Sequence, residues 1–259
     1  MNSVYNTDVS DNQWNVISGI IDEKPRKRKY SLRGIWNAIM YLLRSGCQWR
    51  MLPKDFAPWQ VVYYYFRKWE GYGVIEQVLD AIRGMVRKQE GHEEEPSLGI
   101  IDSRSVKSSH QAHEARGIDG GKKVKGRKQH IVVDVFGFLI GLAVHDASIH
   151  DSVGANSVLE AVKGKSTRLA KILADGGYRG EVLASNVKKE LGCELEIALR
   201  PEQSSKKFQI IPKRWIVERS ISWIENYRRL SCDYENLACT AEAMVMLVFC
   251  NLMINRLHF

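Results

Sequence analysis

The amino-acid sequence predicts an α/β protein in which an all-helical N-terminal region precedes a mixed central β-sheet covered by helices. Apolar residues recur at three- and four-residue steps over residues 1–88, which are rich in aromatic side chains, and this pattern indicates helices. From Leu98 onward, short β-rich apolar runs alternate with helical segments. The 259 residues are 44% hydrophobic and 26% charged, which is typical of a globular protein and excludes a disordered chain.

The N-terminal region contains three expected helices, at Leu32–Arg44, Trp59–Trp69 and Val74–Val86. Ser31 is a residue type that caps helix N-termini, and Gly46 is one that ends helices. The glycines at positions 71 and 73 separate the second helix from the third.

The first two of these helices, with a proline-containing turn between them, resemble a helix-turn-helix DNA reader. Arg67 and Lys68 on the second helix are its candidate DNA contacts. The turn is longer than the usual three or four residues. The alternative is that the aromatic residues here form a hydrophobic core and contact no base.

A polar, acidic connector at residues 89–96 is the best candidate for a domain boundary. It predicts a helical DNA-binding domain over residues 1–95 and a second domain over residues 96–259. A surface loop within one domain is the alternative interpretation of the same segment.

The second region is expected to form a hairpin within a larger sheet. Its turn is Phe136-Gly137, which separates two β-rich runs. The expected strands are Leu98–Ile101, His130–Val135, Phe138–Val144, Lys171–Ala174 and Glu194–Leu199. The expected helices are Ser152–Val162, Glu181–Leu191, Lys213–Leu230 and Thr240–Leu257.

Two aspartates each follow a short apolar run: Asp102 follows Leu98–Ile101, and Asp175 follows Ile172–Ala174. In α/β sheets chemistry collects near strand ends, so these carboxylates meet if their strands are neighbours. Two close carboxylates repel, and a divalent cation removes that repulsion. Oxygen ligands favour Mg²⁺ or Mn²⁺. The alternative is that each aspartate only forms a turn.

Glu218 is the candidate for a third metal ligand, because it lies on a polar stripe of the helix expected around residues 213–230. A polar stripe is also typical of a solvated helix face. The other candidate carboxylates do not follow a short strand as Asp102 and Asp175 do; they are Asp134, Asp146 and Asp151.

The chain carries 38 Lys and Arg against 30 Asp and Glu, a net charge of +8 that suits a polyanionic partner. A glycine-punctuated cationic segment is a candidate phosphate-binding loop, with contacts from Lys122, Lys123, Lys125, Arg127 and Lys128. It lacks the spacing of a P-loop, and a solvated loop is the alternative. Two further basic clusters lie at residues 24–29 and at residues 206–207 with 213–214.

Several other classes of protein are not indicated. No apolar run reaches the ~18 residues of a transmembrane helix, and the N-terminus lacks a signal-peptide pattern, so we expect a cytoplasmic protein. The five cysteines form no CxxC pair and predict neither a zinc site nor disulfides. His110 and His113 have no obvious third ligand nearby, and there is no GxSxG motif of a serine hydrolase.

Five stretches of the sequence together resemble bacterial insertion-sequence transposases of the DDE class, in the IS-five family. They occur in the expected order and span most of the chain, at residues 46–53, 101–107, 125–130, 174–180 and 214–219.

The resemblance implies an RNase H-like catalytic domain in which Asp102, Asp175 and Glu218 form the DDE triad. It implies two Mg²⁺ or Mn²⁺ ions per active site, cleavage of DNA at the transposon ends and transfer to target DNA. The N-terminal helices would help to bind terminal inverted repeats, and two copies would act together near the bacterial nucleoid. Arg179, Arg214 and Arg219 lie in the matching stretches and join the candidate DNA contacts.

The sequence departs from the related signature of Tyr, Arg, Glu and Lys around the third carboxylate. Ile211 stands in place of the Tyr and Glu225 in place of the Lys, and Arg228 or Arg229 is the expected substitute cation. Two other functions stay open: a non-transposing nuclease of the same fold, and a DNA-binding regulator with an inactive site.

Overall fold

The computed structural model describes residues 5–21, 27–198 and 213–259. Its N-terminal part is helical, as expected. It contains α1 (Asp11–Ile21), α2 (Leu32–Ser45), the short 3₁₀ helix η1 (Trp49–Met51), α3 (Trp59–Gly71) and α4 (Val74–Gln89). The three predicted helices are therefore confirmed, with α4 extending slightly further than expected. Residues 24–26 of the basic cluster at 24–29 and all of the pair at 206–207 lie outside the described residues.

Helix α1 was not predicted, although its start carries a recognisable signal. The Ser10 hydroxyl accepts a hydrogen bond from the Gln13 backbone N–H at 3.2 Å, and the Gln13 side chain accepts one from the Ser10 N–H at 2.9 Å. This reciprocal pair is a capping box, which satisfies two otherwise unpaired donors at the helix start.

Helix α2 begins and ends at the residues that the sequence indicated. The Ser31 hydroxyl accepts a hydrogen bond from the Gly34 N–H at 3.0 Å. Gly46 ends the helix in the left-handed conformation, with φ of 72°. A β-carbon on Gly46 would lie 2.8 Å from the Arg228 side chain, so this glycine also allows the end of α2 to pack closely on the C-terminal part of the chain.

The sheet has six strands: β1 (Leu98–Lys107), β2 (Gly117–Asp119), β3 (Val124–Val133), β4 (Leu139–Asp146), β5 (Lys171–Ala174) and β6 (Glu194–Ile197). Its long path runs β4-β3-β1-β5-β6, and β2 pairs with the start of β3. Strands β1, β5 and β6 are parallel, while β1, β3 and β4 are antiparallel neighbours. This mixed order confirms the expected α/β class and is consistent with an RNase H-like fold.

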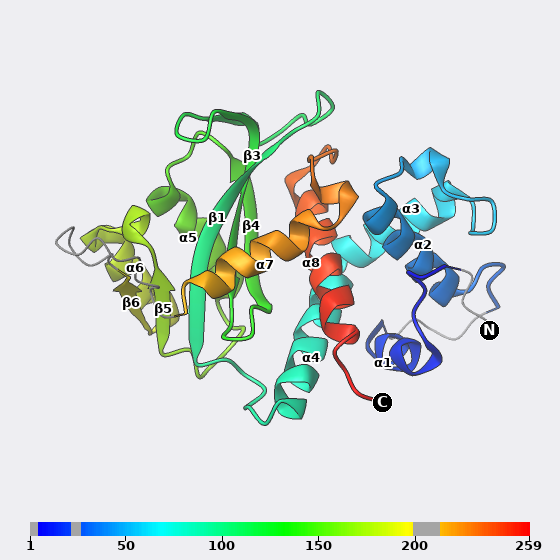
Figure 1. The fold of residues 1–259 in the computed structure, drawn as a ribbon, viewed down its shortest axis with the longest axis horizontal. Coiled ribbons are helices and arrows are strands. Elements are labelled where there is room, and N and C mark those ends of the chain that lie inside the picture. Colours follow the sequence, from blue (N-terminus) through cyan, green and yellow to red (C-terminus); the bar gives the residue numbers. More distant parts are fainter. Residues whose placement is uncertain (1–4, 22–26, 199–212) are drawn as a thin grey trace, which may run out of the picture.

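Helices cover both faces of the sheet (Figure 1). Helices α5 (Asp151–Val162) and α6 (Glu181–Leu191) share one hydrophobic core with the first face. The other core lies beneath α7 (Trp215–Glu225) and α8 (Ala238–Ile254), and it also includes apolar residues of α1 to α4. This second core contains residues from both sides of the loop at residues 90–97, which joins α4 to β1. The domain boundary at residue 95 stays a prediction.

Three expected elements have different bounds in the structure. Strand β1 continues to Lys107 instead of ending before Asp102, because residues 102–107 pair with β3. Strand β3 begins at Val124, so much of the expected cationic loop is strand. Helix α7 ends at Glu225, and the separate 3₁₀ helix η3 (Arg228–Leu230) follows it.

None of the described helices is long and apolar enough to cross a membrane. The five cysteines are free thiols in the structure.

Glu242 is a partly buried carboxyl on α8 that faces strand β4. Its Oε1 accepts a hydrogen bond from the Val144 N–H at 2.7 Å. Burial, together with the negative charges of Glu70 and Glu76, raises the pKa of Glu242 to about 7. Ionisation of this group therefore opposes folding.

The variant Glu242→Gln is expected to stabilise the protein at pH 8 by about 2 kcal/mol. The folded-state pKa lies above the ordinary value of 4.5, so the wild type loses stability as the pH rises through 7 and the variant does not. Urea unfolding at pH 5 and pH 8 measures this difference, which should shrink at the lower pH. The exposed Glu225→Gln is the control, and an equal gain from both variants would contradict the role of burial.

Candidate active site

Asp102 and Asp175 lie opposite one another on neighbouring parallel strands. The parallel register pairs Ile100 of β1 with Leu173 of β5, and each aspartate lies two residues beyond its member of that pair. Asp175 also caps the short 3₁₀ helix η2 (Gly176–Tyr178), where its Oδ1 accepts a hydrogen bond from the Gly177 N–H at 2.8 Å. The juxtaposition that the sequence argument required is therefore present.

The Asp102 carboxyl is held in an environment that resists a negative charge. Burial, together with the negative charge of Asp175, raises the pKa of Asp102 to about 6. The Ser103 N–H donates to Asp102 Oδ1 at 2.7 Å. This hydrogen bond and the positive charges of Arg214 and Lys122 lower the pKa of Asp102 and offset part of the rise. Two carboxylates so close together favour a cation between them.

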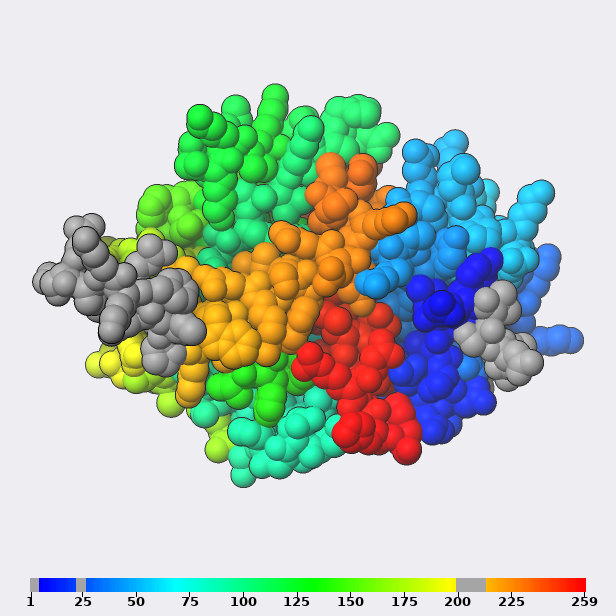
Figure 2. Space-filling model, viewed as in Figure 1, coloured from blue at the N-terminus to red at the C-terminus, as the bar shows by residue number. Residues whose placement is uncertain are grey.

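Glu218 lies in the first turn of α7, which crosses the front of the molecule in Figure 2 and packs on the sheet through its apolar residues. Arg214 connects Glu218 to Asp175: its Nη2 lies 2.8 Å from Glu218 Oε1, and its Nη1 lies 3.7 Å from Asp175 Oδ2. One guanidinium is thus shared by the second and third carboxylates of the predicted triad.

The three side chains are of the ligand type that hard divalent cations prefer, since all of them offer carboxylate oxygens. Asp102, Asp175 and Glu218 are the residues that would hold such an ion. Within the part of the chain that the structure describes, no three His, Cys, Asp or Glu side chains converge tightly enough to hold a metal ion. Arg214 is the cation that Asp175 and Glu218 share in this arrangement.

Several predicted DNA contacts are exposed near this site. Lys122 and Lys123 are exposed on the turn between β2 and β3, and Lys125 is exposed at the start of β3. Lys122 Nζ donates to the Ser103 carbonyl oxygen at 3.2 Å. Arg179 is exposed directly after η2. Of these cations, Lys122 and Arg179 lie beside the edge of the sheet that carries Asp102 and Asp175.

Arg127 and Lys128 are buried, so their prediction as DNA contacts is wrong. Both lie in strand β3 instead of a loop. Lys128 Nζ bonds to the Ile149 carbonyl oxygen at 2.7 Å and to Asp151 Oδ1 at 2.8 Å. Gly126, just before them, lets the strands approach closely, since a β-carbon there would lie 1.9 Å from the Val106 carbonyl oxygen.

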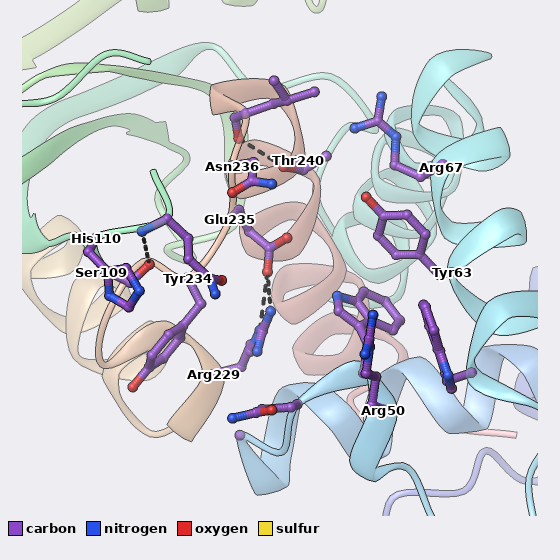
Figure 3. Close-up of a pocket in the computed structure, with 16 residues that line it drawn as sticks. Arg50, Tyr63, Arg67, Ser109, His110, Arg229, Tyr234, Glu235, Asn236 and Thr240 are labelled. Atoms are coloured by element: carbon purple, nitrogen blue, oxygen red, sulfur yellow. Dashed lines mark hydrogen bonds and ion pairs between the residues drawn. The ribbon is translucent and has the colours of Figure 1, made fainter. Parts of the chain in front are cut away.

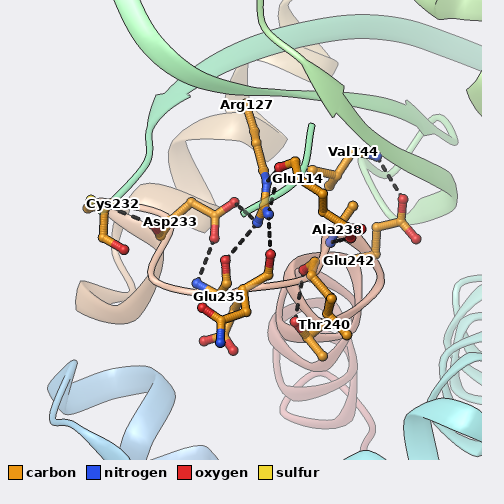
Figure 4. A network of polar contacts seen from close by, with 12 residues as sticks. Glu114, Arg127, Val144, Cys232, Asp233, Glu235, Ala238, Thr240 and Glu242 are labelled. Atoms are coloured by element: carbon orange, nitrogen blue, oxygen red, sulfur yellow. Dashed lines mark hydrogen bonds and ion pairs between the residues drawn. The ribbon is translucent and has the colours of Figure 1, made fainter. Parts of the chain in front are cut away.

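The Arg127 guanidinium joins strand β3 to the segment that leads into α8 (Figure 4). It forms an ion pair with Asp233 Oδ2 at 3.0 Å and donates to the carbonyl oxygens of Glu114, Glu235 and Asn236. All of its donors are used within the protein, which leaves none for a phosphate.

Arg219 is also occupied inside the protein. Its guanidinium lies 4.7 Å from the Trp215 ring centre and 4.8 Å from that of Trp223, and its Nη2 donates to the Phe136 carbonyl oxygen at 2.8 Å. Arg219 therefore holds α7 against the β3–β4 turn. This structural role explains the presence of an arginine here, and no DNA contact is needed to explain it.

Of the two arginines expected to substitute for the missing signature lysine, Arg228 and Arg229, the structure excludes Arg229. Arg229 is buried and pairs with Glu235 at 2.6 Å, so it is not available near Glu218. Arg228 is exposed. Ile211, which replaces the signature tyrosine, lies outside the described residues.

A cavity of about 810 Å³ lies between the N-terminal helices and the second region (Figure 3). Arg50 and the predicted DNA contact Arg67 line one side, and His110 lies on the opposite side. Among the described lining residues Glu235 is the sole carboxylate, and Arg229 neutralises it. Lys68, beside Arg67 on α3, is half-buried, and its Nζ lies 5.8 Å from the Tyr65 ring centre.

Comparison with known protein families gives two matches that together span both regions. Residues 93–254 match a family model described as "Transposase DDE domain", which covers more than half of the chain. The chain belongs to the DDE transposase family. Residues 9–79 match a second model, described as "Putative transposase of IS4/5 family". The resemblance identified from the five sequence stretches is confirmed, and DNA is the substrate class that this family implies.

An uncharacterised protein of Sinorhizobium fredii, y4sN, is similar to part of this DDE family member. The two are 26% identical over 115 residues, which is 43% of this chain and 86% of that protein.

Three residues near the acidic site were not singled out as functional by the sequence. Tyr178, His130 and the rejected carboxylate Asp151 gather behind Asp102 and Asp175, where the charge of Asp151 affects the pKa values of both Tyr178 and His130. Tyr178 lies in the stretch at 174–180 and His130 ends the stretch at 125–130. For Tyr178 and His130, their place in these family-like stretches was the sequence signal that could have identified them. Asp151 lies in none of the stretches.

Proposed function

We propose that this DDE family member binds the terminal inverted repeats of an insertion sequence, cuts DNA at its ends and joins those ends to target DNA. The position of Asp102 opposite Asp175, with Glu218 bonded to the same arginine as Asp175, is the observation that supports this function most strongly. Bound divalent cations, two per site in this proposal, would activate the attacking oxygen and stabilise the leaving oxygen.

The chain's own side chains supply the binding and orientation for this chemistry. Asp102, Asp175 and Glu218 provide the oxygen ligands for Mg²⁺ or Mn²⁺. Lys122 and Arg179 border these carboxylates and are suited to neutralise the phosphates on either side of the scissile bond. Arg214, freed from Glu218 when a cation takes its place, is suited to the same task.

The cavity between the two regions extends the proposed DNA-binding surface. Arg50 and Arg67 give it a positive rim, and Arg50 is held 5.4 Å from the Trp59 ring centre. The rim faces the loop that contains His110, so duplex DNA lying across it would contact both family-matched regions. The inverted repeat is the expected ligand for this part of the surface.

The deciding experiment is a strand-transfer assay on DNA that flanks the gene. Short inverted repeats bordered by a direct duplication would identify the ends. We expect Mg²⁺-dependent nicking at those ends and covalent joining to a target plasmid, by an assembly that contains two copies of the chain. Cleavage without joining would instead indicate a non-transposing nuclease, and binding without cleavage would indicate a DNA-binding regulator.

Removing the three exposed lysines of the β2–β3 turn and the start of β3 should weaken DNA binding in a salt-dependent manner. The triple variant Lys122→Ala, Lys123→Ala, Lys125→Ala loses three phosphate-neutralising charges. The slope of log affinity against log salt should therefore fall by about 3. Filter binding between 50 and 200 mM salt measures this slope. Neutralising Lys163, Lys188 and Lys189 removes the same charge elsewhere, and an equal change there would contradict a local contact.

A further inference from the structure

The turn that carries Asp175 is fastened to the protein by one buried side chain. Helix η2 follows Asp175 directly, and the Tyr178 N–H donates to the Asp175 carbonyl oxygen at 3.1 Å. Gly176 and Gly177 are exposed, whereas Tyr178 is only 1% exposed. The position of the Tyr178 ring therefore helps to set the position of Asp175.

The Tyr178 ring lies behind the acidic site, against strands β1 and β3. Burial and the negative charges of Asp102 and Asp151 raise the pKa of Tyr178 well above its ordinary value, so the phenol is a neutral donor. The Ser103 hydroxyl is near enough to lower this pKa in part, but it donates its proton to Asp151 Oδ1 at 3.0 Å. Within the described residues, no hydrogen bond of normal geometry reaches the Tyr178 hydroxyl.

The Tyr178 ring packs edge-on against the ring of His130, with their centres 5.8 Å apart. His130 is fully buried, and its Nδ1 lies 2.6 Å from Nε2 of His145. Gly154 of α5 closes the other side, since a β-carbon there would lie 2.4 Å from His145 Nε2. The two histidines are therefore held in one arrangement.

The protonation pattern of this histidine pair follows from its neighbours. His145 Nδ1 lies 2.9 Å from the Asp146 carbonyl oxygen, which accepts only, so Nδ1 carries the proton. Burial keeps both rings neutral, because it lowers the pKa of each histidine. His145 Nε2 is then an acceptor, and His130 Nδ1 must donate to it. His130 Nε2 is left with a free lone pair.

His130 Nε2 is thus a buried acceptor with no hydrogen-bond partner among the described residues, and the Tyr178 hydroxyl is a buried donor in the same condition. An unpaired buried polar group costs about 1–3 kcal/mol. Two such groups of opposite kind on rings in contact point to each other as partners.

We propose that the Tyr178 hydroxyl donates to His130 Nε2, and that this buried pair is a positioning device that holds Asp175 in register with Asp102. The proposal rests on the proposed metal-dependent function and adds to it two residues that touch neither DNA nor the ligand oxygens. Asp151 and Lys128, joined at 2.8 Å, close the polar layer around the pair.

The variant Tyr178→Phe tests this proposal, because it keeps the ring and removes only the hydroxyl. Groups that orient metal ligands typically contribute 10–100-fold in metal affinity or activity. We expect Mn²⁺ binding to the full chain with DNA bound, followed by electron paramagnetic resonance, to weaken about tenfold in this variant. The turnover rate for nicking should fall by a similar factor, and the affinity for DNA should not change.

Tyr227→Phe is the matched control. Tyr227 is another buried tyrosine, whose hydroxyl accepts a hydrogen bond from Asn251 Nδ2 at 2.8 Å, away from the acidic site. It should retain Mn²⁺ affinity and turnover. Wild-type Mn²⁺ affinity in Tyr178→Phe would overturn the proposal, as would an equal loss in Tyr227→Phe.

A double-mutant cycle with His130→Phe tests the partnership itself. If the two groups act through one hydrogen bond, the double variant should be no worse than the more affected single variant. Fully additive losses would contradict the pairing. Failure of the proposed function looks different: wild-type protein would then show neither nicking nor an Mn²⁺ site that is sensitive to Asp102→Asn.

Discussion

Replacing Asp102 with asparagine is expected to abolish DNA cleavage while leaving DNA binding largely intact. The same result is expected for Asp175→Asn and for Glu218→Gln. Each change removes a charged ligand oxygen from the proposed site and keeps the shape of the side chain. The loss of electrostatic stabilisation at a reacting phosphate should lower the cleavage rate by at least about 10²–10³-fold.

These variants should remain folded, because each replaces an acidic group at a crowded or exposed position with a neutral isostere. Asp102→Asn in particular removes the repulsion between Asp102 and Asp175. Nicking of DNA that carries the transposon end measures catalysis, and a gel-shift assay with the same DNA measures binding.

Glu225→Gln is the control, since Glu225 is an exposed acid on the same helix as Glu218 and pairs only weakly with Arg104, at 3.8 Å. It should cleave as the wild type does. Wild-type nicking by any one of the three triad variants would remove that residue from the proposed triad.

The second large effect is structural: Arg127→Ala is expected to destabilise the protein by about 3–5 kcal/mol. The substitution leaves Asp233 buried without its cation, and it leaves the carbonyl oxygens of Glu114, Glu235 and Asn236 without their donor. Lysine should not restore stability, because a single ammonium group does not reproduce a planar guanidinium that makes five hydrogen bonds.

Lys125→Ala provides the comparison, two residues earlier on the same strand. Lys125 is exposed, so its loss should leave the free energy of unfolding within about 0.5 kcal/mol of wild type and weaken DNA binding instead. Urea unfolding and filter binding of both variants separate the two roles. A stable Arg127→Ala protein with reduced DNA affinity would restore the original prediction for Arg127.

The contrast between Lys125 and Arg127 shows where sequence reasoning reached its limit. Both residues belong to one basic, glycine-containing segment, and composition makes them equivalent. Their roles diverge because strand β3 lies between two helical layers, where residues on both faces of the strand are buried. That burial depends on elements distant in the sequence, such as the segment around Asp233.

Local signals served well where a residue acts through its immediate neighbours. Ser31 and Gly46 correctly bounded α2, and the expected bounds of β5 and α6 matched the structure. The predicted strand ended at Ile101, whereas β1 continues to Lys107. The second half of β1 is polar and is a strand because it pairs with β3, which a local sequence pattern does not reveal. The sequence predicted that Asp102 and Asp175 meet only on the condition that their strands are neighbours, and the structure meets that condition. The contact of Arg214 with both Asp175 and Glu218 was not predicted.

The continuous hydrophobic core beneath α7 and α8 has a mechanical consequence for the proposed reaction. Helices α1 to α4 are built into the same packed unit as strands β1, β3 and β4, without a slack tether between them. If the N-terminal helices bind DNA as proposed, that DNA would lie at a fixed distance from the acidic cluster. The phosphate to be cut would then be selected by its distance from the bound sequence.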